Sequence, residues 1–275
     1  MPDPGAPMTD FLDESFSIPA RLGVVADVQD GEFRLTLRPR AELLRHGALR
    51  ASMVAFLIDV AAGVILDDDP ATWMLTSDMS VRMRPVPAPD FVSTRTTVLR
   101  RGRRSATATV DVVTGDGAQV ATGAIGFARV PRRDADPVKP PASPGRMSTM
   151  FDGSRTLDRP LRDEAGIVVL DAVAGALEMP VTPELRNPAG TLQGAMVALF
   201  AEAAAEELAS ARFGTAAVVT ELDLRYLAQT ADGPVRSECA VLGDGPDAPI
   251  QVKLSDSSHG RLTTLVYART ATLPA

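Results

Sequence analysis

A thirteen-residue pattern occurs twice in the chain. Residues 47–59 read GALRASMVAFLID and residues 190–202 read GTLQGAMVALFAE, so glycine, leucine, methionine, valine and alanine recur at a constant offset of 143 positions. Each copy predicts an apolar helix that carries a carboxylate, Asp59 or Glu202, at the same place. A helix that is apolar all round must be covered on most of its sides. The repeat therefore requires a second layer of structure over both helices.

Segments with the alternation and the valine and threonine content of strands accompany each helix. In the first half they are 31–39, 73–85, 91–102, 105–113 and 119–130, and in the second half 166–173, 216–228, 235–243, 249–256 and 261–271. The hairpin signal TGDG at 114–117 is followed, at the same offset of 143, by SSHG ending at Gly260. The order of elements is thus also repeated.

This order predicts an α+β protein made of two units, 1–131 and 149–275. Each unit is a long central helix wrapped by an antiparallel sheet, and we expect the helices to pack side by side and the sheets to join. Residues 132–148 contain four prolines and scattered charges. They predict a surface linker that crosses between the units and adds nothing to the core.

The composition limits the classes of function. With 45% hydrophobic and 23% charged residues, the chain is expected to pack as a soluble protein. Its net charge of −7 argues against nucleic acid as a partner. A single cysteine, Cys239, and two histidines leave no obvious metal site. The acidic opening MPDPGAPMTDFLDE does not have the pattern of a signal peptide, and 51–66 is too short for a membrane span, so we expect a cytoplasmic protein.

At the start of each helix the chain resembles hotdog-fold acyl-CoA thioesterases of the phenylacetic-acid-pathway and 4-hydroxybenzoyl-CoA type. Their signature is Asn, then Gly, then His or Gln followed by two glycines, with Asp or Glu nine positions after the His or Gln. The second copy supplies Asn187, Gly190, Gln193, Gly194, Ala195 and Glu202. The first copy supplies Leu44, Gly47, Arg50, Ala51, Ser52 and Asp59. The resemblance covers nearly the whole chain as two tandem units.

This resemblance implies hydrolysis of an acyl-CoA thioester by a water that a carboxylate activates, with no cofactor beyond the coenzyme A of the substrate. The start of a helix presents unpaired N–H groups that suit a developing oxyanion, and Gly194 fits that position. Eight residues separate Gly194 from Glu202, about 12 Å along a helix, so one thioester cannot contact both. The carboxylate must come from a neighbouring antiparallel helix.

Two unequal sites follow from this pairing. One combines Asn187, Gln193 and Gly194 with Asp59 as general base or nucleophile. The other combines Leu44, Arg50 and Ala51 with Glu202, and we expect it to be salt-bridged and inactive. Simpler interpretations remain open for every residue: a solvent-facing Asp59, an acidic face around Glu202, a turn at Asn187, and an ordinary early helix residue at Gln193.

The basic segment LRRGRR (99–104) is a candidate for binding the phosphates of coenzyme A, through Arg100, Gly102, Arg103 and Arg104. A solvated basic hairpin is the alternative. His46, His259 and Cys239 receive no functional role. A non-catalytic acyl-CoA or lipid-like ligand-binding protein and, below it, an acyl-thioester hydratase or dehydratase are the competing functions, and a homo-oligomer is possible.

Overall fold

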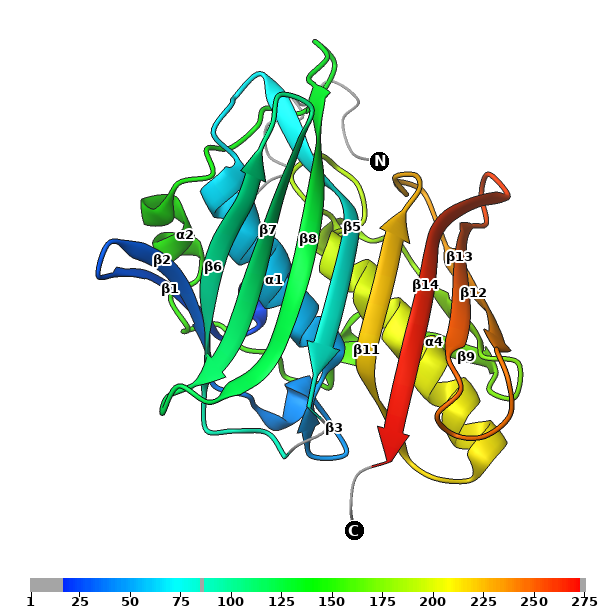
Figure 1. The fold of residues 1–275 in the computed structure, drawn as a ribbon. Coiled ribbons are helices and arrows are strands. Elements are labelled where there is room, and N and C mark those ends of the chain that lie inside the picture. The colour runs from blue at the N-terminus through cyan, green and yellow to red at the C-terminus, as the bar shows by residue number, and fades with distance from the viewer. Residues whose placement is uncertain (1–16, 85–86, 273–275) are drawn as a thin grey trace.

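The structure is a computed structural model that describes residues 17–84 and 87–272 of the 275-residue chain. The acidic opening segment and the last residue of the predicted 73–85 strand lie outside these ranges. One large antiparallel sheet curves around two long helices, which lie side by side behind it in Figure 1. This is the tandem α+β arrangement that the repeat predicts.

The two central helices are α1 (Ala51–Leu66) and α4 (Gly194–Phe213). The shorter helices of the described residues are α2 (Pro144–Met150) and α3 (Leu161–Glu164). Short 3-10 turns lie at Pro19–Arg21, Ala41–Leu43 and Pro183–Leu185. Helix α1 is buried along most of its length, and α4 is buried from Ala195 to Glu206 and again at Leu208 and Ala209. Gly214 ends α4 in the left-handed conformation, with φ of 69°, which favours glycine.

The sheet has the strand order β1-β2-β6-β7-β8-β5-β11-β14-β13-β12-β10-β9. The first unit contributes β1 (Val24–Gln29), β2 (Glu32–Leu37), β5 (Thr72–Met83), β6 (Val92–Arg101), β7 (Ser105–Thr114) and β8 (Gln119–Pro131). The second contributes β9 (Val168–Asp171), β10 (Ala176–Met179), β11 (Ala217–Tyr226), β12 (Val235–Val241), β13 (Ile250–Asp256) and β14 (Arg261–Thr272). A small separate hairpin joins β3 (Leu44–Arg45) to β4 (Ala48–Leu49).

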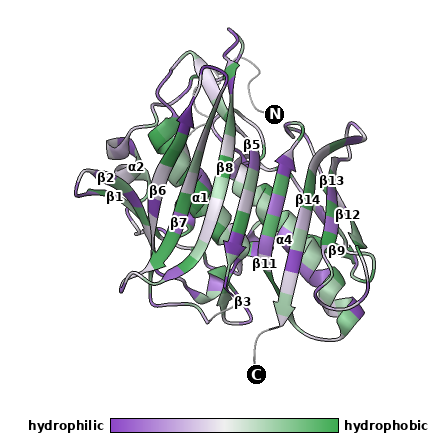
Figure 2. Ribbon diagram, viewed as in Figure 1, coloured by the Kyte–Doolittle hydropathy of each residue, from purple (hydrophilic) through white to green (hydrophobic). Residues whose placement is uncertain are grey.

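Hydrophobic and polar residues alternate along the strands, as Figure 2 shows, because successive side chains point to opposite faces of a sheet. The inward side chains pack on the two helices and form one core cluster with them. Both predicted hairpin turns are present, with Gly117 (φ 86°) and Gly260 (φ 58°) in the left-handed conformation. Strands β1 and β10, helices α2 and α3 and the β3–β4 hairpin were not predicted.

The units join where β5 pairs with β11, from Arg82 opposite Glu221 to Asp78 opposite Arg225. Beyond Asp78 the two strands separate, because β5 continues against β8 while Tyr226 stays paired with β14. They diverge toward the top of Figure 1. This fork between the strands lies over the region between the two helices.

The expectation that 132–148 adds nothing to the core is wrong at its end. Met147, on α2, is 7% exposed and belongs to the core cluster. Just beyond it, Phe151 packs edge-to-face on Phe56 of α1, with ring centroids 5.9 Å apart. Ser143 caps α2 by accepting a hydrogen bond from Arg146 N. Proline content indicated an extended crossing but did not exclude a short helix with a buried side chain.

Candidate active site

Each central helix places its first residues beside the carboxylate of the other helix. The backbone N–H of Ala51, at the start of α1, donates to Glu202 Oε1 over 2.7 Å. At the start of α4, a Cβ built on Gly194 would lie 3.4 Å from Asp59 Oδ2. The antiparallel packing of α1 and α4 therefore creates two related pairings, one on each side of the interface between the units.

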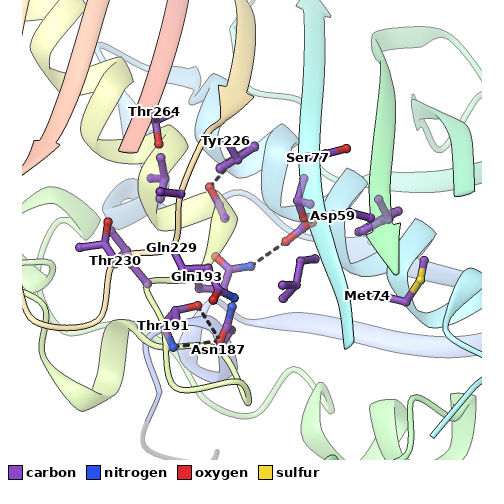
Figure 3. Close-up of a pocket in the computed structure, with 18 of the residues that line it drawn as sticks. Asp59, Met74, Ser77, Asn187, Thr191, Gln193, Tyr226, Gln229, Thr230 and Thr264 are labelled. Atoms are coloured by element: carbon purple, nitrogen blue, oxygen red, sulfur yellow. Dashed lines mark hydrogen bonds between the residues drawn. The ribbon is translucent and has the colours of Figure 1, made fainter. Parts of the chain in front are cut away.

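In the first pairing, Asp59 receives two hydrogen bonds. Thr76 Oγ1 donates to Oδ1 over 2.8 Å, and Gln193 Nε2 donates to Oδ2 over 3.0 Å. Figure 3 shows Asp59 and Gln193 pointing toward one another from the two units. The carboxylate is half-buried and lines a cavity. It is thus held in place by two donors while it remains open to a ligand.

Burial raises the pKa of Asp59 to about 6, and the hydrogen bond from Thr76 opposes part of that rise. A pKa in this range leaves the group largely ionised at neutral pH while it is much more basic than an ordinary aspartate. A general base works best when its pKa lies near the operating pH. Asp59 therefore has the protonation behaviour that removing a proton from water requires.

The start of α4 is organised by Gln193, which is 8% exposed. Its Oε1 accepts from Ala195 N over 2.8 Å and from Met196 N over 3.1 Å, while its Nε2 holds Asp59. Among the described residues, the N–H of Gly194 has no hydrogen-bond partner. Since Gly194 also has no side chain, a ligand can approach this N–H closely. An oxyanion beside Asp59 would find one unused backbone donor at the positive end of a helix.

Tyr226, at the end of β11, is a site residue that the sequence analysis missed. Its hydroxyl donates to Gly194 O over 2.9 Å. Burial and, after it, the charge of Asp59 raise the pKa of Tyr226 well above its ordinary value, so the hydroxyl stays protonated. Thr76 was also missed. Thr76 lies on β5 and Tyr226 on β11, and each reaches the site through the way its strand packs on the helices. The repeated thirteen-residue pattern does not include either residue, so it gave no signal for them.

Asn187 lies in the loop before α4, and its Oδ1 accepts from Ala189 N, Thr191 N and Thr191 Oγ1 over 3.0 to 3.3 Å. These contacts support the simpler interpretation, in which Asn187 shapes a turn. The residue also lines the cavity, as Figure 3 shows, but no hydrogen bond joins it to Asp59. Gly190, with φ of 81°, belongs to the same turn.

The cavity has a volume of about 400 Å³ and passes through the fork between β5 and β11. Phe127 lies on the helix side of the sheet, since its ring is 3.9 Å from a Cβ built on Gly63. By strand alternation Ala128 lies on the outer side. Both line the cavity, so it reaches from the outer face of the sheet to the helices. The walls are as follows: Asp59, Gly63, Met74–Ser77, Phe127, Ala128, Val130, Asn187, Pro188, Thr191–Gly194, Val197, Tyr226–Thr230 and Thr264.

In the second pairing, the carboxylate occupies the start of the helix itself. Glu202 is fully buried and accepts from Ala51 N, Ser52 N and Ser52 Oγ. Arg50, which is 4% exposed, lies 3.5 Å from Glu202 Oε2 and donates to Glu206 Oε2 over 3.3 Å. The salt bridge expected from the sequence is present. A thioester has no free donor at this helix start.

The buried cluster around Glu202 extends to a second carboxylate. Glu206, 1% exposed, also lies 3.3 Å from Arg45 Nε. Burial and then the charge of Glu202 raise the pKa of Glu206 to about 8, although Arg50 and Arg45 act in the opposite direction. The acidic face proposed as an alternative for this stretch is buried, not solvated.

The basic segment forms the turn between β6 and β7, at the end of the sheet where the fork opens (Figure 1). Arg101 is already engaged by Asp68 and by Ile65 O. Arg100, Arg103 and Arg104 are exposed. The backbone of Arg104 accepts from Arg129 N, next to Ala128 and Val130 of the cavity wall. The turn is thus close to the cavity but not part of its lining.

Residues without a predicted role lie outside the cavity lining. His46 is in the β3–β4 turn, His259 contacts Asp256, and burial raises the pKa of Cys239 to about 12. Within residues 17–84 and 87–272, no group of three or more His, Cys, Asp and Glu side chains could hold a metal ion. No helix in the same ranges is long and apolar enough to cross a membrane.

Comparison with known proteins supports this architecture. Residues 2–124 match the family model of the acyl-CoA thioesterase C-terminal domain. No curated protein matches the chain. Among solved structures, a presumed thioesterase from Novosphingobium aromaticivorans is 20% identical, with a TM-score of 0.62, over 91% of this chain and 99% of that one. An acyl-ACP thioesterase from Bacteroides thetaiotaomicron is 12% identical, with a TM-score of 0.59, over 86% and 97%.

A third structure, a hot dog fold protein from Alicyclobacillus acidocaldarius, is 14% identical with a TM-score of 0.58 over 94% of this chain and 98% of that one. These similarities extend over both units of the chain. The narrower phenylacetic-acid-pathway or 4-hydroxybenzoyl-CoA type remains a prediction. The chain has the tandem hotdog fold found among thioesterases, and its first half matches the acyl-CoA thioesterase C-terminal domain in sequence.

Proposed function

We propose that the protein hydrolyses acyl-CoA thioesters at the site formed by Asp59 and the start of α4. The observation that carries the proposal is the unpartnered N–H of Gly194 beside a carboxylate whose pKa is raised to about 6, both inside one cavity. The hotdog fold and the match of residues 2–124 to an acyl-CoA thioesterase domain support thioesterase activity in general.

The proposed reaction uses Asp59 as a general base. Asp59 takes a proton from a water whose oxygen attacks the thioester carbonyl carbon. The carbonyl oxygen gains negative charge and accepts a hydrogen bond from Gly194 N–H. When the C–S bond breaks, the protonated Asp59 returns its proton to the thiolate, and a carboxylic acid and a thiol leave. Gln193 and Thr76 position Asp59, and Tyr226 fixes the peptide of Gly194.

Coenzyme A is the proposed thiol carrier because three exposed arginines, Arg100, Arg103 and Arg104, lie near the outer mouth of the cavity. Guanidinium groups bind phosphate through paired, charge-assisted hydrogen bonds. The amides of the pantetheine arm need hydrogen-bond partners when they are buried. Thr191, Gln229 and Thr230 supply such partners along the cavity wall.

The test is a measurement of free thiol released from a series of acyl-CoAs, with acyl-carrier-protein thioesters and enoyl-CoAs assayed in parallel. Thiol release from acyl-CoA supports the proposal. Faster release from the carrier-protein thioester would assign a different thiol carrier to the same chemistry. Addition of water to an enoyl-CoA would instead indicate a hydratase, and tight binding without turnover would indicate a binding protein.

The pH dependence tests the role of Asp59 directly. Because its pKa is raised to about 6, kcat/KM is expected to rise about tenfold per pH unit below pH 6 and to level off above it. A profile that is flat between pH 4.5 and 7 would contradict a general base with this pKa.

A further inference from the structure

A second, smaller cavity adjoins the active-site cavity on the helix side of the sheet. Its volume is about 200 Å³. One wall is a single face of α1 and the residue after it, at Val60, Val64 and Asp67. The other wall is the inter-unit segment, at Lys139, Pro140, Ala142, Arg146 and Met147. The two cavities share Gly63, Met74, Leu75, Asn187 and Pro188. A ligand can therefore extend from one into the other.

Gly63 forms the passage between the cavities. It lies four residues after Asp59, which is one turn along the same face of α1. A Cβ built on Gly63 would meet nothing closer than Phe127, at 3.9 Å. The absence of a side chain here leaves open space directly beyond the catalytic carboxylate. A group attached to the carbonyl carbon at Asp59 would pass over Gly63.

The two cavities differ in chemistry. The larger one includes the polar side chains of Thr191, Gln229 and Thr230 in its lining. The smaller one is lined mostly by apolar side chains, among them Val60, Val64 and Met147. A pantetheine arm needs the former and a hydrocarbon the latter. We propose that the smaller cavity binds the acyl group of the substrate, that the inter-unit segment sets which acyl groups fit, and that the preferred substrates carry an aliphatic chain.

The one lysine in this cavity cannot recognise a charged acyl group. Lys139, 6% exposed on its side chain, uses its three N–H donors on Asp67 Oδ1, on Asp69 O at 2.8 Å and on Thr72 O at 2.6 Å. An ammonium group has three donors and no more. Arg146 is engaged as well. Lys139 therefore ties the inter-unit segment to the end of α1. A second carboxylate on the acyl group would meet the carboxylate of Asp67 and would find no N–H donor left on Lys139.

The size of the cavity limits chain length. A cavity of about 200 Å³ can hold several chain carbons. This inference rests on the proposed function, because it assigns a substrate class to the same site. Short to medium aliphatic acyl-CoAs, up to octanoyl-CoA, are the expected substrates, and succinyl-CoA is expected to be a poor one.

The experiment compares Ala142→Phe with Ala135→Phe. Both alanines lie in the inter-unit segment, but only Ala142 lines the cavity, and Ala135 is exposed. The measured quantity is the ratio of kcat/KM for octanoyl-CoA to that for acetyl-CoA. Filling an apolar pocket discriminates by the size of the acyl group, so Ala142→Phe is expected to lower this ratio by roughly tenfold or more, and Ala135→Phe to leave it unchanged.

Gly63→Leu is a second variant that blocks the passage from the opposite wall. Leucine favours a helix more than glycine does, and its Cβ has room, so the variant is expected to fold. It should lower the same ratio. Suppose that the wild-type protein hydrolyses thioesters. An octanoyl-to-acetyl ratio that is the same in both variants as in the wild type, or a wild-type preference for succinyl-CoA, then overturns the acyl-cavity inference alone. Absence of thiol release from every substrate overturns the proposed function instead.

Discussion

The starts of α1 and α4 are copies of one pattern with opposite outcomes. At α1 the carboxylate of Glu202 occupies the helix start, and the N–H of Ala51 is used at 2.7 Å. At α4 the carboxylate of Asp59 accepts a hydrogen bond from Gln193 Nε2 and none from the N–H of Gly194. That N–H has no partner among the described residues. The filled pairing shows where a carboxylate oxygen binds at a helix start, and the corresponding position at α4 is the one that we propose for the substrate oxygen.

One methylene group accounts for much of this difference. Glutamate is longer than aspartate by that group, which lets Glu202 reach the backbone donors that Asp59 does not reach. The residue before each helix adds to the difference. Arg50, before α1, forms an ion pair with Glu202, whereas the equivalent Gln193, before α4, gives Asp59 a neutral hydrogen-bond donor, and no cation pairs with Asp59 among the described residues. Burying a carboxylate without one raises its pKa. The same duplication thus yields one buried ion pair and one carboxylate that faces a cavity.

The largest expected effect separates the two carboxylates. Asp59→Asn removes the general base and is expected to lower kcat by about a hundredfold or more. Glu202→Gln is expected to change kcat far less, because Glu202 lines neither of the two cavities described above. Steady-state kinetics on one acyl-CoA, with circular dichroism to check folding, compares the two variants. Equal losses would mean two working sites, and a loss confined to Glu202→Gln would reverse the assignment.

A longer carboxylate at position 59 tests the role of side-chain length. Asp59→Glu keeps the charge and the possible base, but the added methylene lets the carboxylate reach Gly194 N–H, as Glu202 reaches Ala51 N–H. We expect kcat to fall by roughly tenfold to a hundredfold, since the oxyanion loses its donor. Full activity in Asp59→Glu, measured on the same substrate, would show that Gly194 N–H is not the donor.

The repeat predicted the fold well because the helix pattern and the hairpin turn both recur at one constant offset, which can be read directly from the sequence. The constant offset of 143 residues predicted two units. Helix length predicted that each carboxylate pairs with the start of the other helix, and the structure places Asp59 beside Gly194 and Glu202 beside Ala51. Tyr226 could not be predicted, since its position depends on where β11 ends. Nor could the occupancy of the two helix starts, because it follows from whether a side chain reaches across the packed helices. The site roles themselves remain predictions.

A smaller effect is expected from removing the exposed arginines of the basic turn. It concerns the open site alone, because the corresponding turn of the second unit has no basic residue. Arg103→Ala and Arg104→Ala are expected to raise KM for acyl-CoA by roughly fivefold and to change kcat less, because a phosphate contact is equal in ground and transition states. Arg101→Ala is the matched control, since Arg101 is engaged by Asp68. The same rise in KM with an acyl-pantetheine, which lacks the nucleotide, would exclude a phosphate role.

The smallest effect concerns the filled pairing and its pH dependence. Glu206 faces Arg50 and Arg45 from the first unit and Glu202 from its own helix, and its pKa rises from an ordinary 4.5 to about 8. Between these two values the folded protein holds a proton that the unfolded chain has released. The free energy of unfolding therefore decreases as pH rises through this window.

Glu206→Gln cannot ionise and lacks this decrease. We expect the Tm of the wild type to fall relative to that of Glu206→Gln between pH 5 and pH 8, by about 2 to 4 °C for each kcal/mol, and the difference to stay constant above pH 8. Asp59→Asn should show the same sign in a lower window, between pH 4 and pH 6, because burial raises the pKa of Asp59 only to about 6. Thermal melts of the three proteins at matched pH values measure both windows. A Tm difference for Glu206→Gln that stays constant between pH 5 and pH 8 would mean that Arg45 and Arg50 keep Glu206 ionised, and that the filled pairing is a fully charged ion cluster.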